Sequence, residues 1–339
     1  MNSLILQKQE VVIALAQFDI KDAVLKKCLL KEDETVITVP DGVTTIGKDA
    51  LCGLQSVIAV TLPESLKVIN DGAFYGCSSL TSVTLPGSVE RLGSCAFAQC
   101  SALNTIYLDN KLTAIGNSAF WGCTSLESID IPEGVTKIGY NLFGSCLSLI
   151  SVSLPDTVTE LDERAFKECT SLACITLPDS LTKIGNMAFL NCHNLKSVNI
   201  PDRLESIGEK AFFMCESLHE LEIPDGIASV GGDAFSDCVS VTVRSTISGK
   251  PLYKAVTATG GSSAYNFILR NIWDKGGFDF TAQDNYFPAL QDENLQYAIA
   301  FSRLMYRVNL SAAAEEHYLD FLHNNAENAV RYCITQDSA

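Results

Sequence analysis

Residues 80–102 read LTSVTLPGSVERLGSCAFAQCSA, and this stretch decides the fold of most of the chain. Val83 and Leu85 alternate with polar residues, as in a short strand with one buried side. Pro86 then ends the strand, because proline has no N–H for a sheet ladder. Further apolar clusters follow before the next strand, so the segment predicts one turn of a coil with a hydrophobic interior.

The same pattern recurs nine times at a spacing of 23 residues, with no insertion or deletion. The proline position is held by Pro40, Pro63, Pro86, Asp109, Pro132, Pro155, Pro178, Pro201 and Pro224. A fixed period of about 20 to 50 residues is typical of a solenoid, in which each unit packs on its neighbours. We therefore predict a stack of about nine rungs that displays a surface rather than carrying out chemistry.

Two positions of the repeat predict columns of identical side chains inside the stack. The aromatic column is Phe74, Phe97, Phe120, Phe143, Phe166, Phe189, Phe212 and Phe235. The thiol column is Cys77, Cys100, Cys123, Cys146, Cys169, Cys192, Cys215 and Cys238. Stacked side chains about 5 Å apart that point the same way suit neither a disulfide nor a tetrahedral zinc site. We expect these cysteines to be buried and reduced.

A further position of the repeat is almost always glycine. Its members are Gly47, Asn70, Gly93, Gly116, Gly139, Asp162, Gly185, Gly208 and Gly231. Glycine, asparagine and aspartate tolerate a positive φ better than other residues. This position therefore predicts a sharp left-handed corner in every rung.

The repeat L-x-x-[VI]-x-[LI]-P-x-x-[VL]-x-x-[IL]-G-x-x-A-F-x-x-C resembles the BspA-like leucine-rich repeats, common in bacteria, over about residues 35–244. The resemblance implies a leucine-rich-repeat solenoid, a stack of parallel strands whose outward side is the concave face that binds partners. Family members are often secreted, adhesive surface proteins, which gives adhesion to host proteins as an alternative function.

Many leucine-rich repeats carry a ladder of asparagines after the strand. The corresponding positions in this chain include Ser65, Ser88, Lys111, Gly134, Thr157 and Ser180. We therefore expect the proline to stabilise this turn instead.

The ends of an open stack need covers. Residues 1–34 are predicted to form an N-terminal cap in front of the array, which is assigned to residues 35–244. Within the cap, residues 24–30 are expected to pair with residues 35–39 as a hairpin. A helix over residues 4–16 is expected to lie on it.

Beyond the array, residues 245–339 are predicted to form a small helical module. The spacing of apolar residues predicts one helix over residues 292–307 and a second after a Ser311 cap. Asn324 with Glu327 predicts a capping box that opens a third. A further alternative makes this module the effector and the array its scaffold.

The chain carries a net charge of −16 and has a pI near 4.6. This charge argues against nucleic acid and anionic membranes as partners, since both attract basic proteins. The residues after the proline position are Asp41, Glu64, Gly87, Asn110, Glu133, Asp156, Asp179, Asp202 and Asp225. We call this column the acidic edge and expect a protein or peptide partner that is basic, with a divalent cation as the weaker alternative.

No run of 18 or more apolar residues occurs, so no membrane-spanning helix is predicted. The many thiols favour the reducing cytoplasm. A secreted or cell-surface location is the alternative if the natural N-terminus was trimmed.

The search for chemistry gives no catalytic residue, metal site or cofactor. Ser248-Gly249-Lys250 lacks the upstream glycine of a phosphate-binding loop. His317 and His323 are six residues apart and do not share a helix face, as zinc ligands would. The sequence predicts a non-enzymatic protein–protein interaction scaffold. Its predicted partner-binding residues are Thr61, Thr84, Tyr107, Asp130, Thr176, Asn199, Glu220 and Glu222.

Overall fold

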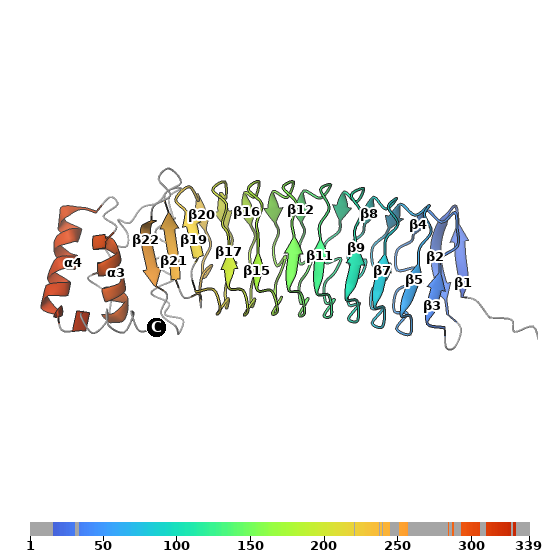
Figure 1. Cartoon of the computed structure of the whole chain (residues 1–339), viewed down its shortest axis with the longest axis horizontal. Coiled ribbons are helices and arrows are strands. Elements are labelled where there is room, and N and C mark those ends of the chain that lie inside the picture. The colour runs from blue at the N-terminus through green and yellow to red at the C-terminus, as the bar shows by residue number, and fades with distance from the viewer. Residues whose placement is uncertain are drawn as a thin grey trace, which may run out of the picture.

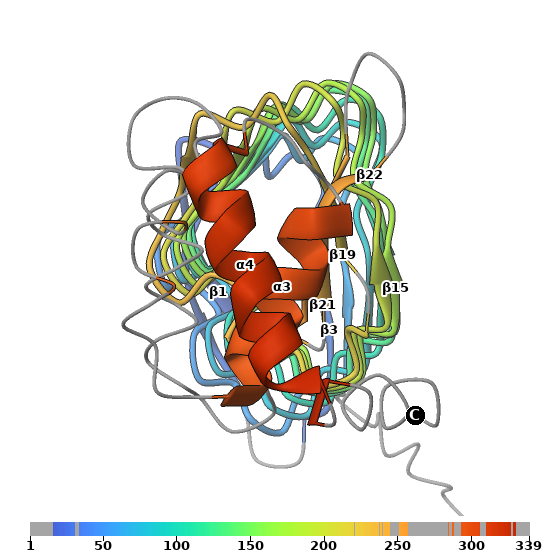
Figure 2. The same ribbon diagram turned by 90° about the vertical axis from the view of Figure 1, so that its left-hand side faces the viewer.

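The computed structural model describes residues 16–30, 34–219, 221–236, 238, 240–244, 251–256, 284, 287, 293–305, 310–326 and 328–329. Most of them form an elongated β-solenoid of about nine turns, as the period predicts (Figure 1). Viewed end on, successive rungs lie nearly on top of one another (Figure 2). The stack is therefore close to straight.

Each rung contributes two short strands to two separate columns. The first column holds β3 (Val36–Thr38), β5 (Ala59–Thr61), β7 (Ser82–Thr84), β9 (Thr105–Tyr107), β11 (Ser128–Asp130), β13 (Ser151–Ser153), β15 (Cys174–Ile175), β17 (Ser197–Val198), β19 (Leu221–Pro224) and β21 (Ser240–Arg244). The second column holds β4 (Thr45–Ile46), β6 (Val68–Ile69), β8 (Arg91–Leu92), β10 (Ala114–Ile115), β12 (Lys137–Ile138), β14 (Glu160–Leu161), β16 (Lys183–Ile184), β18 (Ser206–Ile207) and β20 (Ser229–Val230).

Paired strands within a column are parallel, and residues 23 positions apart lie side by side, as Ser82 and Thr105 do. The alternation of the sequence is confirmed, since Val83 is buried between exposed Ser82 and Thr84. Stacking therefore turns each repeat position into a continuous column.

The phenylalanine column fills the interior. Neighbouring rings of Phe74 to Phe235 stack with centroids 4.9–6.0 Å apart and planes within 15° of parallel. All eight rings are almost wholly buried. Their centroid spacing lies in the range at which aromatic pairs attract one another, so the column joins the rungs from within.

The cysteine column is buried, as predicted, and has an additional role. Each of its thiols donates a hydrogen bond to a backbone carbonyl of the preceding rung, and Cys100 Sγ lies 3.1 Å from the Phe74 oxygen. In the same column Cys146 Sγ lies 3.2 Å from the Phe120 oxygen. The twelve described cysteines are all free thiols. The column therefore links rungs by polar contacts as well as by packing.

The glycine column is not the left-handed corner that the sequence predicts. Its backbone has no positive φ. Close approach favours glycine at most of these positions instead, because a Cβ on Gly93 would lie 2.4 Å from the Asp71 nitrogen of the preceding rung.

The left-handed residues occupy two other positions of the corner. The first set is Asp49, Gly72, Cys95, Ser118, Asn141, Arg164, Met187, Lys210 and Asp233. The second set is Gly53, Gly76, Gln99, Gly122, Ser145, Glu168, Asn191 and Met214. In the first set the backbone N–H reaches the next rung, as Cys95 N does to the Asn117 oxygen at 2.9 Å. This bond between rungs imposes the conformation on residues of almost any type.

The predicted N-terminal hairpin is wrong. Strand β1 (Gln17–Lys21) pairs antiparallel with β2 (Val24–Leu29), through a two-residue turn at Asp22 and Ala23 that has φ near +54° and +58°. This tight turn brings β2 beside β4, while β3 starts the first column by pairing with β5. A β-bulge between Asp19 and Ile20 interrupts the outermost pair. The helix expected over residues 4–16 falls on residues 4–15, outside the described residues, and on Ala16, which is not helical.

At the other end, β22 (Pro251–Val256) pairs antiparallel with β21, and α3 (Glu293–Met305) lies against β22 (Figure 1). The second expected helix is α4 (Ala312–Asn324), and Ser311 caps it by accepting a hydrogen bond from Ala314 N. The expected third helix begins just after Asn324, which ends α4, since residues 326, 328 and 329 are helical and Ala329 N donates to the Asn325 oxygen at 2.9 Å. Glu327 lies outside the described residues.

A buried ion pair joins the two C-terminal helices. Arg303 of α3 is fully buried and holds both carboxylate oxygens of Asp284, at 2.9 and 3.0 Å. The Tyr318 hydroxyl of α4 donates to the same carboxylate at 2.6 Å. Bidentate, charge-assisted contacts of this kind fix geometry as well as contributing energy. The carboxylate therefore sets the relative position of α3 and α4.

The buried thiols should resist alkylation. Burial raises the pKa of the Cys123 and Cys192 thiols to about 12, so the reactive thiolate is scarce at mildly alkaline pH. Iodoacetamide on the native chain, read by peptide mass spectrometry, should modify exposed Cys52 and Cys174 but leave both buried thiols unmodified. The unfolded chain should be modified at all four. Equal labelling of Cys52 and Cys123 in the native chain would contradict the buried column.

At a left-handed position of the corner, introducing glycine should raise the stability of the protein, and removing glycine should lower it. Met214 and Gly76 occupy the same position, with φ of +59° and +71°. A side chain there costs about 1–2 kcal/mol, part of which is offset by the lower entropy of the unfolded chain. We expect Met214→Gly to raise the free energy of unfolding by roughly 0.5–1 kcal/mol and Gly76→Ala to lower it similarly. Urea titration measures both, and shifts of the same sign would exclude this account.

Candidate functional site

The outward residues of the first column form a continuous exposed surface, which we call the first-strand face. Seven of the predicted binding residues lie on it and are exposed: Thr61, Thr84, Tyr107, Asp130, Thr176, Asn199 and Glu222. Tyr107 is the most prominent, with 67% of its surface accessible. Glu220 lies outside the described residues. Because the stack is nearly straight, this face is close to flat along its length rather than strongly concave (Figure 2).

The first-strand face and the acidic edge meet in shallow hollows. Thr176 and Asn199 line one hollow together with Asp156 and Asp179 of the edge. A second, nearer the N-terminus, joins Thr61 and Thr84 to Glu64. The structure thus brings exposed hydroxyls and carboxylates, which come from different repeat positions, to a common surface.

Arg203 adds a positive charge to this surface. It lines the hollow next along the edge, together with Asp179, Asn199 and Asp202. It stands at the repeat position that holds Ser180 in the preceding rung. The acidic character of the edge is therefore reduced at the seventh and eighth rungs.

Asn199 has a structural role that its sequence position did not reveal. Its side-chain oxygen accepts a hydrogen bond from Leu177 N at 2.7 Å, and its side-chain nitrogen donates to Leu177 O at 2.9 Å. In a regular rung, a backbone oxygen accepts the corresponding bond, as Thr61 O does from Val39 N. The amide of Asn199 thus replaces part of the sheet ladder, and a partner would have to displace these bonds to use it.

The turn under the acidic edge is held by two sets of bonds. The proline carbonyl closes the turn, as Pro86 O does by accepting from Val89 N at 3.0 Å. A hydroxyl also donates to the preceding rung, with Ser88 Oγ 2.6 Å from the Leu66 oxygen. Ser65, Thr157 and Ser180 make the equivalent bond. The proline was expected to stabilise the turn; the hydroxyl ladder was not foreseen.

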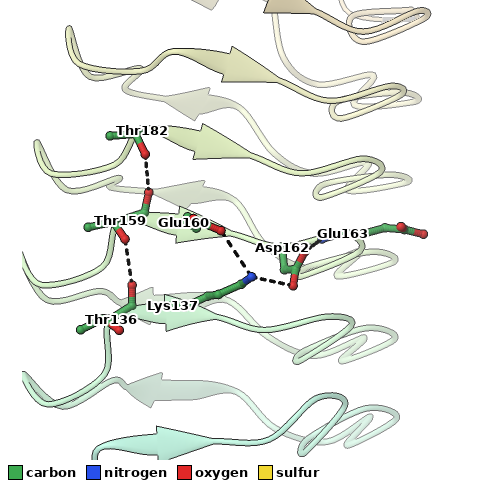
Figure 3. A network of polar contacts seen from close by, with 7 residues as sticks. All are labelled: Thr136, Lys137, Thr159, Glu160, Asp162, Glu163 and Thr182. Carbon is green, nitrogen blue, oxygen red and sulfur yellow. Dashed lines mark hydrogen bonds and ion pairs between the residues drawn. The ribbon is translucent and has the colours of Figure 1, made fainter.

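A second polar surface lies over the second column of strands (Figure 3). Lys137 reaches the next rung, where its ammonium lies 3.3 Å from Glu160 and 3.0 Å from Asp162. Beside this cluster, Thr159 donates to the Thr136 carbonyl, and Thr182 repeats the contact on Thr159. These contacts run from rung to rung, so this cluster helps to hold the stack.

The cluster alters the acidity of its members. Burial acts to raise the pKa of Asp162, but the Glu163 amide and the Lys137 ammonium outweigh it and lower that pKa. The hydrogen bond to Asp162 is the main reason why the pKa of Lys137 is raised. Both shifts mean that folding stabilises the charged forms of Asp162 and Lys137. The pair therefore contributes to the free energy of unfolding at pH values between the pKa of Asp162 and the pKa of Lys137.

Among the residues that the structure describes, no group of three or more histidine, cysteine, aspartate or glutamate side chains is placed to hold a metal ion. None of the described helices is long and apolar enough to cross a membrane. The arrangement offers an extended surface for contact.

The Asp162 cluster should give a stability difference that depends on pH. Its folded-state pKa is lowered, so its contribution is present above the unfolded value of about 3.9 and is lost as the pH falls through the folded value. We expect Asp162→Asn to cost up to about 1 kcal/mol at neutral pH, since the pair is partly exposed. That cost should vanish in strong acid. The measurement is the urea midpoint across pH, with Asp130→Asn on the first-strand face as the control that shows little change. A cost that persists unchanged in acid would refute the assignment.

Comparisons with known proteins agree with the repeat architecture of the structure. The model of the BspA type leucine rich repeat region matches residues 19–150 and 136–250. A search of curated proteins gave no match. Among solved structures, a leucine-rich repeat protein from Bacteroides ovatus is 30% identical with a TM-score of 0.63, over 69% of this chain and 65% of that one. The chain thus spans somewhat under two thirds of that protein's length.

Two further solved structures are more distant. A leucine-rich repeat protein of T. pallidum is 26% identical with a TM-score of 0.41, over 66% of this chain and 86% of that one. A leucine rich cell surface protein from Faecalibacterium prausnitzii is 23% identical with a TM-score of 0.42, over 78% and 96%. With its period, its two strand columns and the family match in agreement, the chain belongs to the BspA-type leucine-rich repeat proteins.

Proposed function

We propose that this protein is a non-enzymatic scaffold that binds a protein or peptide through its first-strand face and acidic edge. The observation that carries the proposal is the meeting of the two surfaces, where Thr176 lies in one hollow with Asp156 and Asp179. Such a hollow offers hydroxyls for hydrogen bonds and carboxylates for charge. An extended segment that crosses several rungs would find a hydroxyl or a carboxylate at most steps.

The charge of the edge favours a basic partner. Acidic residues occupy seven of its nine positions, at a spacing of about 4.8 Å set by the strands. A row of like charges speeds the encounter with an oppositely charged partner and fixes its orientation. It adds less to the final affinity, because exposed charges are screened by salt. A partner rich in lysine or arginine therefore fits the edge.

Tyr107 is the proposed anchor of the first-strand face. Tyrosine is enriched among the interface residues that contribute most to binding. Tyr107 projects from a surface of threonine, serine and acidic side chains, and two thirds of it is accessible to a partner. Burying this ring would supply the apolar contact that the surrounding hydroxyls lack.

The proposed location is the cytoplasm, where the twelve described free thiols would stay reduced. Identification of the mature N-terminus in the native organism tests this location. A processed N-terminus on the cell surface would favour adhesion instead. Removal of residues 262–339 separates an array-driven interaction from one that belongs to the C-terminal helices, since the first should survive the cut.

The binding surface can be tested with peptides selected from a displayed random library on the full chain. We expect the selected peptides to be rich in lysine or arginine and to bind more weakly as salt rises. Asp156→Lys with Asp179→Lys should weaken binding at least about tenfold, or about 1.4 kcal/mol. Tyr107→Ala should cost about 1–2 kcal/mol.

The matched control reverses two charges on the other side of the stack. Glu90 and Glu205 are exposed beside the second column of strands. Glu90→Lys with Glu205→Lys changes the net charge by the same amount, so it should leave the affinity nearly unchanged. Equal losses in both double variants would show that only net charge matters and would reject the proposed surface.

A further inference from the structure

The rungs of the array are not joined equally. Both columns of strands lose their pairing at the same place, between β9 and β11 in the first column and between β10 and β12 in the second. At the next joint, β11 pairs with β13 and β12 with β14. The first column breaks again further on, but there the second column continues from β12 to β20. Among the described rungs, this is the joint at which both ladders stop.

The joint lies between the fourth rung (Leu103–Ser125) and the fifth (Leu126–Ser148). The backbone bond that remains on the strand side is long, with Glu127 N 3.5 Å from the Asn104 oxygen. One joint later, Ile150 N lies 2.8 Å from the Glu127 oxygen. The strands of the fourth and fifth rungs therefore lie side by side without a regular ladder.

The side-chain ladders are interrupted at the same joint. Gly134 occupies the position at which Ser88 and Thr157 donate to the preceding rung, so the Leu112 carbonyl lacks that donor, as the preceding carbonyls also do at Lys111, Arg203 and Gly226. Thr113 and Thr159 each donate to the rung before them. The described contacts include no such bond from Thr136 to Thr113.

The interior is also looser in the fourth rung. Leu108 and Ile115 are half-buried, whereas their counterparts one rung earlier, Leu85 and Leu92, are 5% and 1% exposed. The sequence also differs here, because Asp109 replaces the proline of the turn, although Leu154 before Pro155 is half-buried as well. The Asp109 carboxylate accepts a hydrogen bond from Lys111 N at 3.2 Å, which makes a local turn in place of the usual one.

The contacts at the left-handed corner, by contrast, continue between the fourth and fifth rungs. Ser118 N lies 2.8 Å from the Tyr140 oxygen, and Phe120 N lies 3.1 Å from the Leu142 oxygen. The Cys146 thiol still donates to the Phe120 carbonyl. The stack of phenylalanine rings continues as well, with a centroid distance of 5.7 Å. One side of the joint is therefore intact while the strand sides are open.

From this contrast we propose that the array is two stiff blocks joined by a hinge between the fourth and fifth rungs. Bending that keeps the corner bonds must turn about the corner, and it separates β9 from β11 and β10 from β12. Motions of this kind between packed blocks take microseconds to milliseconds. On the strand sides the hinge meets little resistance from hydrogen bonds, because the bond beside the strands, from Glu127 N to the Asn104 oxygen, is long.

The hinge also bears on binding, in a way that rests on the proposed function. Tyr107 of β9 and Asp130 of β11 are both on the first-strand face, on opposite sides of the joint. A partner that contacts both would hold the blocks in one orientation. Such a partner would bind the straight form better than the bent one, and differential affinity is what shifts such an equilibrium.

Pulsed electron spin resonance on the free, full-length chain tests the hinge. Spin labels on keto amino acids, which spare the cysteines, would replace Ser82 and Ser151, exposed residues three rungs apart that span the joint. Ser128 and Ser197 form the control pair, also exposed and three rungs apart, but wholly within the second block. We expect a clearly broader distance distribution for the spanning pair. Equal widths for the two pairs would overturn the proposal.

Hydrogen exchange distinguishes a hinge from local unfolding. Corner amides such as Phe120 N should be as protected as Phe143 N, because the corner stays closed during bending. Exchange at Phe120 more than about tenfold faster than at Phe143 would mean that the rungs separate entirely, which would also overturn the hinge. A broad spanning distribution together with failed peptide binding would leave the hinge in place and reject the scaffold function alone.

Discussion

Backbone hydrogen bonds between residues 22 to 24 positions apart hold each rung on the next, and the rest of the structure depends on them. They set a spacing of about 4.8 Å at which every side chain meets its own counterpart. Phenylalanine stacks on phenylalanine at this spacing, and each thiol of the cysteine column reaches a carbonyl one rung away. Glycine persists where the backbones come so close that a Cβ on Gly93 would meet the chain below. A single distance therefore explains three of the most regular features of the sequence.

The period allowed much of this fold to be predicted, because it states which residues become neighbours. The buried columns and the exposed alternation of the strands follow directly. The corner could not be predicted in the same way, since Arg164 and Met187 adopt a positive φ that their residue types disfavour. There the ladder between rungs overrides local preference. The N-terminal hairpin failed for a related reason, because the turn at Asp22 and Ala23 lacks the glycine that usually marks such a turn.

The candidate surface was predictable in outline and not in detail. Strand alternation identified Thr61, Thr84 and Tyr107 as exposed, and the structure places them so. It could not show that the Asn199 amide is bonded to Leu177, because an outward asparagine in a strand looks like any polar surface residue. The sequence did not predict the second column of strands, because two-residue strands are too short to show alternation. The hollows that join face and edge depend on the spatial path of the turn, which no repeat position reveals by itself.

The two antiparallel strands at the ends of the solenoid have a consequence for how such a protein can change in length. Strand β1 runs against β2, and the register shift between Asp19 and Ile20 makes this end strand a poor edge for a further regular rung. At the other end β22 runs against β21 in the same manner. Whole 23-residue units can be gained or lost between these strands without altering either terminus. The number of rungs is thus free to vary in evolution or by engineering, while the two ends act as fixed stops.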